Sequence, residues 1–352
     1  MNKPIMNTLF FLCALFFASS CNSKAENSQF KMVDSSDVFK DGEYFAEAHA
    51  STLVRLDNGE VLASWFGGTK EGNDDVGIWL ARKTNGNNWS KSIQIAKIRD
   101  DAHWNPVLFV DNSKQVHLFF KVGKKIPTWE TWLMSSTDGG HTWSEPVELV
   151  EGDRGGRGPV RNKPIILSNG NWIAGASTEE GAWIPFVDIS KDDGQSWQRS
   201  ADINFDTVEV KGKGMIQPTL WESTPGKVHM LLRTTSGFIY RSDSEDNGQT
   251  WSEAYSIGLP NPNSGIDLVK MKNGDLALLY NPDSKDWGSR GELRLALSKD
   301  NGSTWKDVFT LESGDPKDEY SYPAIISWDN TLGMTYTFNR KTIVFRELTI
   351  SK

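Results

Sequence analysis

Apolar runs of five or six residues recur along the chain, and each of them follows a short turn signal. Examples are residues 61–65, 116–121, 228–233 and 276–280. The turn signals are Asn58-Gly59, Asn112-Ser113, Asn169-Gly170, Pro225-Gly226, Asn273-Gly274 and Asn330. Asn and Gly accept the positive φ angles of tight hairpins, and short apolar runs bounded by such residues are typical of strands. Six turns therefore predict six antiparallel units.

A longer motif repeats with a fixed period. The pattern Ser-x-Asp-x-Gly-x-(Ser/Thr)-Trp occupies residues 136–143, 190–197, 244–251 and 298–305, and a degenerate copy keeps only Gly86 and Trp89. The tryptophans are spaced 54 residues apart, at Trp89, Trp143, Trp197, Trp251 and Trp305. A period of about 50 residues with four short strands is typical of a propeller blade. The sequence predicts an all-β fold, a six-bladed β-propeller of four-stranded antiparallel blades.

The aspartates of this motif are Asp138, Asp192, Asp246 and Asp300. In a tight turn an aspartate can accept hydrogen bonds from neighbouring backbone groups, while the tryptophan packs between sheets. We therefore assign these aspartates a structural role on blade hairpins, away from the propeller axis.

The N-terminus has the features of an export signal. Lys3 precedes an apolar run at residues 9–17 that is too short to span a bilayer as a helix. Residues 18–21, Ala-Ser-Ser-Cys, resemble a bacterial lipoprotein cleavage site with Cys21 lipidated, although Ala18 and Ser20 also suit ordinary signal peptidase. We expect a signal peptide at residues 1–21, a tether at 22–30 and one propeller domain at 31–352. Residues near 33–39 would pair with strands around 341–348 to close the ring.

Charge and cysteine content narrow the class of protein. A formal net charge of -8 argues against a nucleic-acid partner, because phosphate binding needs a concentrated basic surface. The two cysteines, Cys13 and Cys21, both lie in the signal, so the mature chain has no internal disulfide and no cysteine-based metal site. We expect a monomer without a cofactor, exported to the periplasm or anchored by lipid to the outer membrane of a Gram-negative bacterium.

The innermost strand of a propeller blade begins beside the central channel, where ligands gather. Four of these starts carry a proline, which cannot pair freely in a central strand. The residue before the proline is polar in each case: Asn105, Lys163, Gln217 and Tyr322. One polar side chain per blade, aimed at a single axis, is typical of a sugar site. The alternative is that these side chains bind channel water.

The four motifs resemble the Asp-box repeats of the sialidase (neuraminidase) superfamily, and the resemblance covers essentially the whole mature chain. It implies a glycosidase in which three arginines hold the sugar carboxylate and a loop aspartate protonates the leaving group. A tyrosine, activated by a glutamate, attacks the sugar.

Several residues match this pattern. Residues 66–75 resemble the acid-bearing loop, which implies that Asp74 is the acid/base, with Asp75 as the near alternative. Arg233 and Arg290 resemble the second and third arginines, and Tyr320 resembles the nucleophile. We expect Asp74, Arg233, Arg290 and Tyr320 to meet at the mouth of one channel. The alternatives are a solvated acidic turn for Asp74 and a channel-lining aromatic for Tyr320.

Two positions depart from the pattern. His49 replaces the first arginine, and Gln217 replaces the activating glutamate. Glutamine cannot take a proton from a phenol, so either another group, such as His49 or His103, activates the tyrosine or the chemistry differs. These departures favour an acidic sugar other than sialic acid, such as another ketosidic sugar or a uronic residue.

The leading interpretation is an exo-acting glycoside hydrolase that removes a terminal acidic sugar from a glycan. Substrate contacts would come from His49, His103, Asn105, Lys163, Gln217, Arg233, Arg290 and Tyr322. One alternative is a polysaccharide lyase acting on uronates, for which His49, His103, Lys163 and Tyr320 supply a base and a carboxylate partner. Another is a non-catalytic glycan-binding propeller that uses channel tryptophans, with candidates at Trp65, Trp104, Trp129, Trp132, Trp183 and Trp287.

Overall fold

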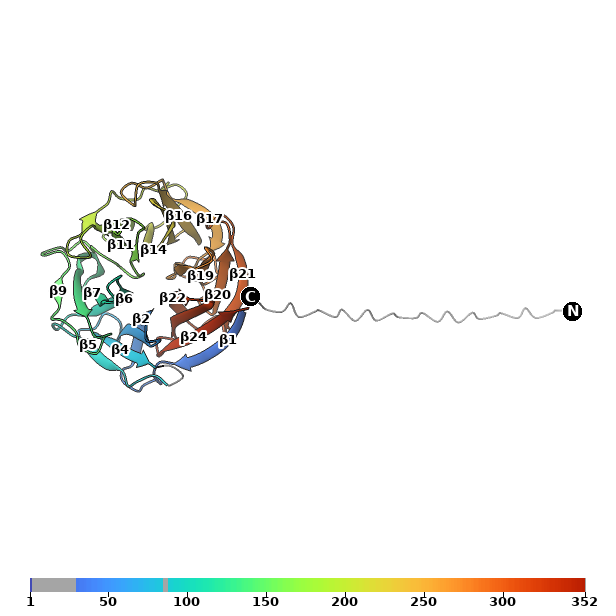
Figure 1. Ribbon diagram of the computed structural model, residues 1–352. Coiled ribbons are helices and arrows are strands. Elements are labelled where there is room, and N and C mark those ends of the chain that lie inside the picture. Colours follow the sequence, from blue (N-terminus) through green and yellow to red (C-terminus); the bar gives the residue numbers. More distant parts are fainter. Residues whose placement is uncertain (2–29, 85–87, 352) are drawn as a thin grey trace.

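The computed structural model describes Met1 and residues 30–84 and 88–351. These residues form six four-stranded antiparallel sheets that follow one another around a ring (Figure 1). The prediction of an all-β, six-bladed propeller is confirmed. The expected signal peptide and most of the tether, including Cys21, lie outside the described residues, as does Gly86 of the degenerate motif.

The blades are numbered here in chain order, and their strands are given from the axis outward. Blades 1 to 3 consist of β2 (Glu47–Arg55), β3 (Val61–Gly68), β4 (Gly77–Lys83) and β5 (Ile93–Ala96); β6 (His103–Val110), β7 (Val116–Val122), β8 (Glu130–Ser136) and β9 (Val147–Glu148); and β10 (Ile165–Ile166), β11 (Trp172–Thr178), β12 (Ile184–Ser190) and β13 (Gln198–Arg199).

Blades 4 to 6 have the same order. They consist of β14 (Met215–Thr224), β15 (Lys227–Thr234), β16 (Phe238–Ser244) and β17 (Tyr255–Pro260); β18 (Asp267–Lys270), β19 (Leu276–Tyr280), β20 (Glu292–Ser298) and β21 (Lys306–Ser313); and β22 (Tyr320–Trp328), β23 (Thr331–Phe338), β24 (Thr342–Ile350) and β1 (Phe30–Asp37).

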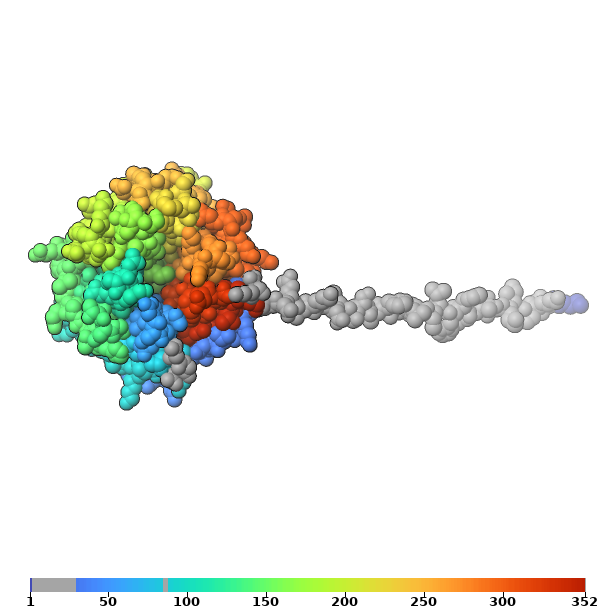
Figure 2. Space-filling view, in the orientation of Figure 1, coloured from blue at the N-terminus to red at the C-terminus, as the bar shows by residue number. Residues whose placement is uncertain are grey.

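Blade 6 joins the two ends of the described chain. β1 pairs antiparallel with β24, from Phe30 opposite Ile350 to Asp37 opposite Val344. In the space-filling view the blue first strand and the red last strands therefore lie side by side in the ring (Figure 2). This pairing covers the edge of β24 that would otherwise be open to other chains. The closure expected from the sequence is present.

The repeated motif forms the hairpin between the third and fourth strands of a blade. Ser136 Oγ donates to Asp138 Oδ1 (2.7 Å), and the same carboxylate accepts hydrogen bonds from the backbone N–H and the hydroxyl of Thr142 (2.9 and 2.6 Å). Asp192, Asp246 and Asp300 are held in the same way. Donors of this kind favour the ionised carboxyl, and those of Thr304 and Ser298 lower the pKa of Asp300 to about 2. The predicted structural role of these aspartates is confirmed.

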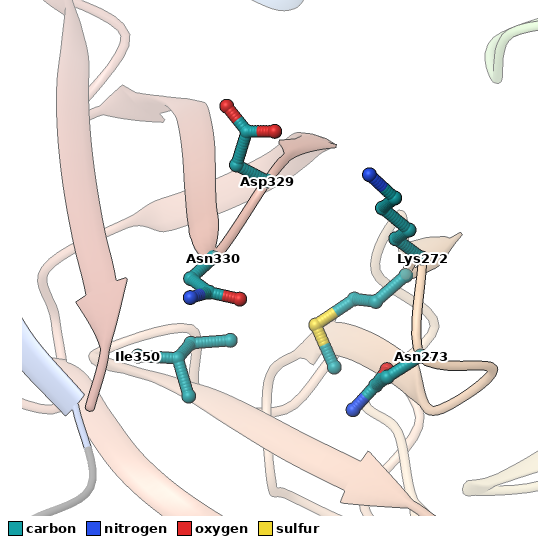
Figure 3. Close-up of a pocket in the computed structure, with 6 residues that line it drawn as sticks. Lys272, Asn273, Asp329, Asn330 and Ile350 are labelled. Carbon is teal, nitrogen blue, oxygen red and sulfur yellow. The ribbon is translucent and has the colours of Figure 1, made fainter. Parts of the chain in front are cut away.

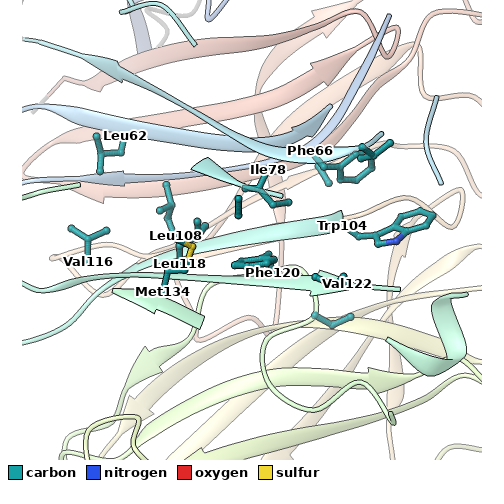
Figure 4. Close-up of a cluster of buried hydrophobic side chains, with 14 of the residues drawn as sticks. Leu62, Phe66, Ile78, Trp104, Leu108, Val116, Leu118, Phe120, Val122 and Met134 are labelled. Atoms are coloured by element: carbon teal, nitrogen blue, oxygen red, sulfur yellow. The ribbon is translucent and has the colours of Figure 1, made fainter. Parts of the chain in front are cut away.

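The core lies between blades, so the inner strands are buried on both faces. Every residue of β3 and of β7 is buried. Between blades 1 and 2, Leu62 and Phe66 pack with Leu108, Leu118 and Phe120 in one continuous cluster (Figure 4). Burial of such side chains contributes about 1.5–3 kcal/mol each, which allows the ring to stand without disulfides.

The innermost strands are interrupted close to where they begin. The pairing register shifts in β2, β6, β14 and β22, and the residue at each shift has a positive φ: Ala50 (55°), Asn105 (40°), Gln217 (57°) and Tyr322 (52°). A bulge re-aims the side chain it carries, and three of these four residues precede a proline that has no N–H to lose from the ladder. Strained backbone conformations are thus concentrated near the starts of the innermost strands, beside the propeller axis.

The described residues contain very little helix. One short 3-10 turn, η1 (Ile126–Thr128), lies between β7 and β8. No helix in the described part of the chain is long and apolar enough to cross a membrane.

Candidate active site

A cavity of about 200 Å³ lies at the end of the axis where the innermost strands begin. All six blades contribute to its wall, which is lined by Glu71, Trp104, Asn105, Ile126, Trp129, Glu179, Trp183, Ile216, Gln217, Arg233, Trp287, Arg290, Tyr322 and Arg340. This volume suits a single sugar residue rather than an oligosaccharide, so groups on opposite walls would contact the same ligand.

The wall has a simple topological origin. In each blade the second strand is antiparallel to the first, so it ends where the first begins, as in the pair Glu47 and Gly68. Loops between the second and third strands therefore return to the same end of the axis. Such loops supply Glu71 (β3–β4), Trp129 (β7–β8) and Arg340 (β23–β24) to the cavity.

Arg233 is the most deeply placed cation of the cavity and is bound only by neutral groups. Its Nε and Nη2 donate to Asn263 Oδ1 (2.9 and 2.7 Å). Its Nη1 donates to Tyr322 Oη (2.6 Å) and to Gln217 Oε1 (3.2 Å). The side chain is 2% exposed. No carboxylate among the described residues forms an ion pair with it, so its charge is left for a ligand.

Arg290 and Arg340 share one glutamate. Glu319 Oε1 accepts from Arg290 Nη1 (3.0 Å) and from Arg340 Nε (3.1 Å), while Arg340 Nη1 also donates to Glu71. Burial lowers the pKa of Arg290. Burial would also lower the pKa of Arg340, but Glu71 and Glu319 outweigh it and raise that pKa. The two side chains are thus held in fixed positions beside Arg233.

Tyr322 stands among cations. Arg233, Arg290 and Arg161 lie 5.6, 5.9 and 5.4 Å from its ring centre. Arg161 is fully buried and donates through Nη2 to the Tyr322 and Pro323 carbonyls, which holds the strained backbone of the bulge. Burial lowers the pKa of Arg161 to about 10. The phenol oxygen therefore faces the cavity within an electropositive wall.

Tyr320, expected at the channel mouth, does not line the cavity. Its ring stacks on Phe338 of the neighbouring strand with centroids 4.9 Å apart, and burial together with Asp318 and Glu312 raises its pKa. In a regular strand residues two apart share a face, but the bulge at Tyr322 turns that side chain toward the axis. The tyrosine in the cavity is Tyr322, two residues further on.

The loop that carries Asp74 reaches the cavity through a different residue. Asp74 is half-exposed and lies 3.5 Å from Lys124. Asp75 accepts hydrogen bonds from the N–H and hydroxyl of Thr69 (2.8 and 2.9 Å), which fixes the loop. Neither aspartate lines the cavity, whereas Glu71 does. Of the four residues expected to meet there, the structure brings together Arg233 and Arg290.

The two histidines are buried rather than exposed to the cavity. His49 packs against Tyr322 with ring centroids 4.2 Å apart, and burial followed by the nearby arginines holds its pKa well below the usual range. His103 Nε2 accepts from the Ile98 N–H (2.9 Å), and Nδ1 bonds the Asp101 carbonyl (2.8 Å). Burial lowers the pKa of His103 to about 4. Both ring nitrogens of His103 are hydrogen-bonded within the protein, and the side chain does not line the cavity.

Lys163 lies away from the cavity. Its Nζ donates to Asp267 Oδ2 (2.8 Å), and its side chain lines a hollow at the opposite end of the axis, beside Trp328 at the end of β22. Blade 3 has no bulge to turn Lys163 round: it is absent from the described non-glycine residues with positive φ. Another hollow at that end lies between turns of blades 5 and 6, with Lys272 and Asp329 on opposite sides (Figure 3). Neither hollow contains any of the three cavity arginines.

Asn105 and Gln217 do lie where the sequence placed them, on the cavity wall. Three charged residues of the cavity were missed: Glu71, Glu179 and Arg340. They come from the loops between the second and third strands of their blades. Only their position within the blade repeat, and not their residue type, could have identified them from the sequence. Among the described residues no group of three or more His, Cys, Asp and Glu side chains is arranged to hold a metal ion.

Comparison with known proteins supports the same family. The family model for the BNR repeat-like domain matches residues 59–334. The chain belongs to this family. Together with the six-bladed ring, this places the BNR-repeat protein in the sialidase-like superfamily, as the sequence motifs implied.

Curated relatives of this BNR-repeat protein are remote. It is 22% identical over 258 residues to a sialidase of Paraclostridium sordellii (63% of this chain, 59% of that protein). It is 26% identical over 222 residues to a sialidase of Bacteroides fragilis (58% and 38%), and 24% identical over 250 residues to an anhydrosialidase of Macrobdella decora (64% and 32%). The chain therefore spans less than two thirds of the length of each of these relatives.

Solved structures share the fold. A Dyadobacter fermentans protein of unknown function superposes with a TM-score of 0.75 at 16% identity, covering 92% of this chain and 99% of that one. A Hadza microbial sialidase gives 0.73 at 19% identity (89% and 68%), and Trypanosoma rangeli sialidase in complex with the inhibitor DANA gives 0.69 at 16% identity (91% and 58%). At these identities the likeness concerns the propeller itself.

Proposed function

We propose that this BNR-repeat protein is an exo-acting glycoside hydrolase that removes a terminal acidic sugar from a glycan. The observation that carries the proposal is the convergence of Arg233, Arg290 and Arg340 on one cavity of single-sugar size. Guanidinium groups bind carboxylates through paired N–H donors, and the pair is strongest where water is excluded. The remote sialidase relatives supply independent support for a glycan substrate.

Arg340 can supply the cation that the pattern lacks at His49. The first arginine of the superfamily pattern is missing from β2, but the β23–β24 turn brings the guanidinium of Arg340 into the cavity. Three cations are thus present, although Arg340 comes from blade 6 and the missing arginine of the pattern belongs to blade 1. A carboxylate held by this altered set would be oriented differently, which supports an acidic sugar other than sialic acid.

Tyr322 occupies the place beside the sugar that was expected for Tyr320, but as a group that stabilises charge and not as the nucleophile. Its hydroxyl accepts a hydrogen bond from Arg233 and lies in the wall that the anomeric carbon would face. Gln217 can hold Arg233 but cannot accept a proton, so it does not act as a base. The phenol oxygen then stabilises the positive charge that develops at the anomeric carbon as the glycosidic bond breaks.

Tryptophans complete the pocket. Trp104, Trp129 and Trp183 are buried in its wall, while Trp287 at its rim is 66% exposed. Indole faces pack against the C–H face of a sugar ring. An aromatic wall beside three cations fits a ligand that is a carbohydrate on one side and an anion on the other.

The residues proposed for a uronate lyase do not share this cavity. His103 is engaged by Ile98 and Asp101, and Lys163 is engaged by Asp267. A lyase would need its base and its carboxylate partner around a single ring. Hydrolysis is therefore the reaction that the site favours.

The proposal is tested by incubating the purified protein with a panel of glycosides of sialic, uronic and other acidic sugars. We expect a free monosaccharide to be released from at least one of them, without new ultraviolet absorbance. An unsaturated product would indicate the lyase instead. Binding with no product from any member of the panel would indicate a glycan-binding propeller.

A further inference from the structure

Two carboxylates line the cavity in the described part of the chain, and their surroundings differ. Glu71 is bound to Arg340, and its backbone N–H donates to Glu47 Oε2 (2.9 Å). Glu179 lines the cavity from the loop between β11 and β12 and makes no hydrogen bond or ion pair with any described residue. One carboxylate is thus engaged by a guanidinium group, and the other has no hydrogen-bond or ion-pair partner among the described residues.

Glu179 is half-buried, and burial raises its pKa. The charged groups that act on it are Arg233 on β15, Lys213 just before β14 and Lys121 on β7, and all three oppose the rise. Lys121 is occupied by Thr131 and the Arg157 carbonyl, so it does not neutralise the glutamate by contact. A carboxyl whose pKa is raised by burial, in a cavity that also holds a second carboxylate, is an arrangement that glycosidases use for the general acid.

We propose that Glu179 is the catalytic acid/base of this site, donating a proton to the glycosidic oxygen and later accepting one from water. The inference rests on the proposed function, because it requires a glycosidic bond in the cavity. It replaces Asp74, which is half-exposed, faces Lys124 and does not line the cavity. In the sequence Glu179 is marked only by its position after the second strand of a blade, in the run Ser177-Thr178-Glu179-Glu180.

The reaction can be written with every proton placed. The Glu179 carboxyl gives its proton to the glycosidic oxygen while the bond from the anomeric carbon to that oxygen breaks. The electron pair stays on the oxygen, and the aglycone leaves as an alcohol. The positive charge that develops at the anomeric carbon is stabilised by Tyr322 Oη. A water molecule then forms a bond to this carbon, and one proton of the water is transferred to the Glu179 carboxylate. The net change is one water consumed for one glycosidic bond broken.

The test compares two leaving groups on whichever acidic sugar the wild-type protein accepts. The 4-methylumbelliferyl aglycone can leave without protonation by an acid, whereas an alkyl or sugar aglycone needs a proton from the general acid in order to leave. We expect Glu179→Gln to lower kcat/KM for the alkyl glycoside by about 100-fold or more, within the usual contribution of general acid catalysis, and for the aryl glycoside by far less. The decline of wild-type activity as pH rises through the pKa of Glu179 should disappear in the variant.

Three controls make the result decisive. Glu180→Gln changes the exposed neighbour and should leave both rates unchanged, as should Asp74→Asn. Glu179→Asp keeps an acid and should recover part of the alkyl rate. Equal losses on both aglycones, or an unchanged pH profile, would overturn the role of Glu179 while leaving the hydrolase intact. No turnover of any glycoside by the wild-type protein would overturn the hydrolase and Glu179 together.

Folding is checked separately. Since Glu179 makes no hydrogen bond or ion pair with the described residues, we expect Glu179→Gln to keep the thermal midpoint of the wild-type protein. If that variant nevertheless fails to fold, the Glu179→Asp variant decides. A wild-type pH profile and a wild-type ratio of alkyl to aryl rates in Glu179→Asp would overturn the proposal, and a shifted alkaline limb would support it.

Discussion

Arg233 Nη1 donates a hydrogen bond to Tyr322 Oη at 2.6 Å, across a gap of 89 residues in the chain. The contact joins blade 4 to blade 6 at the axis and exists because the bulge at Tyr322 points the phenol inward. Removing the hydroxyl would leave Arg233 in place, held by Asn263 on two nitrogens. Tyr322 can therefore be altered without dismantling the cation cluster.

We expect Tyr322→Phe to lower kcat/KM on an accepted glycoside by about 100-fold or more, because the anomeric charge loses its nearest oxygen. Tyr320→Phe is the matched control, two residues away on the same strand, and should retain nearly full activity. Steady-state kinetics on both variants decide the point. A large loss in Tyr320→Phe with little in Tyr322→Phe would restore the assignment that the sequence first suggested.

Arg340 is expected to determine selectivity for the anionic sugar. Arg340→Met should raise KM by about 30-fold or more for a carboxylate substrate, the usual cost of truncating a buried charge partner, with much less effect on its methyl ester. Arg340→Lys should recover little, because one ammonium group cannot serve Glu71, Glu319 and a ligand together. The measurement is KM for an acid and its ester with each variant. Identical losses on both substrates would mean that Arg340 only supports the loop.

The blade architecture was predictable because its signal is periodic. Tryptophans spaced 54 residues apart and six turn signals fix the number of blades, and each copy of the motif is a local hydrogen-bonded hairpin, as in Asp138 with Ser136 and Thr142. Local interactions within eight residues can be recognised from sequence without knowledge of the rest of the fold.

The site was predictable only in part, because its geometry depends on distant contacts. Arg233 lies on the regular strand β15 and Gln217 directly precedes a proline, and both lie on the cavity wall as expected. Tyr320 and Tyr322 are both polar aromatics near Pro323, and only the bulge decides which one faces the axis. Arg340 and Glu179 lie on loops between the second and third strands of their blades. That these loops meet at one end of the axis follows only from the order of strands in the closed ring.

The motif aspartates should affect stability and not chemistry. Asp246 binds Thr250 and Ser244 in its hairpin, so Asp246→Ala should reduce the free energy of unfolding by about 1–2 kcal/mol, similar to the loss of a helix cap. Urea denaturation at pH 7 measures the change. Glu245→Ala, beside it and exposed, should stay within about 0.5 kcal/mol of the wild type. Unaltered stability in Asp246→Ala would contradict the stabilising role of the hydrogen-bonded turn.

His103 should make the protein acid-sensitive. Its folded-state pKa of about 4 lies below the unfolded value near 6.5, so the folded state resists protonation. Its contribution is complete above pH 6.5 and is lost as pH falls from there toward 4, because protonation would break the bond from the Ile98 N–H. We expect the unfolding free energy of the wild type to fall through this range more steeply than that of His103→Gln. The exposed His141→Gln should follow the wild type; equal slopes in all three would contradict the prediction.

The central claim is that Arg233, Arg290 and Arg340 receive the carboxylate of one sugar whose anomeric carbon faces Tyr322. The most direct measurement is a crystal structure of the protein with the acidic monosaccharide released in the glycoside screen. We expect the sugar inside the six-blade cavity, with its carboxylate within hydrogen-bond distance of the three guanidinium groups and its anomeric carbon beside Tyr322 Oη. A sugar seated at the opposite end of the axis beside Lys163 and Trp328, or one with its carboxylate turned away from the arginines, would contradict it.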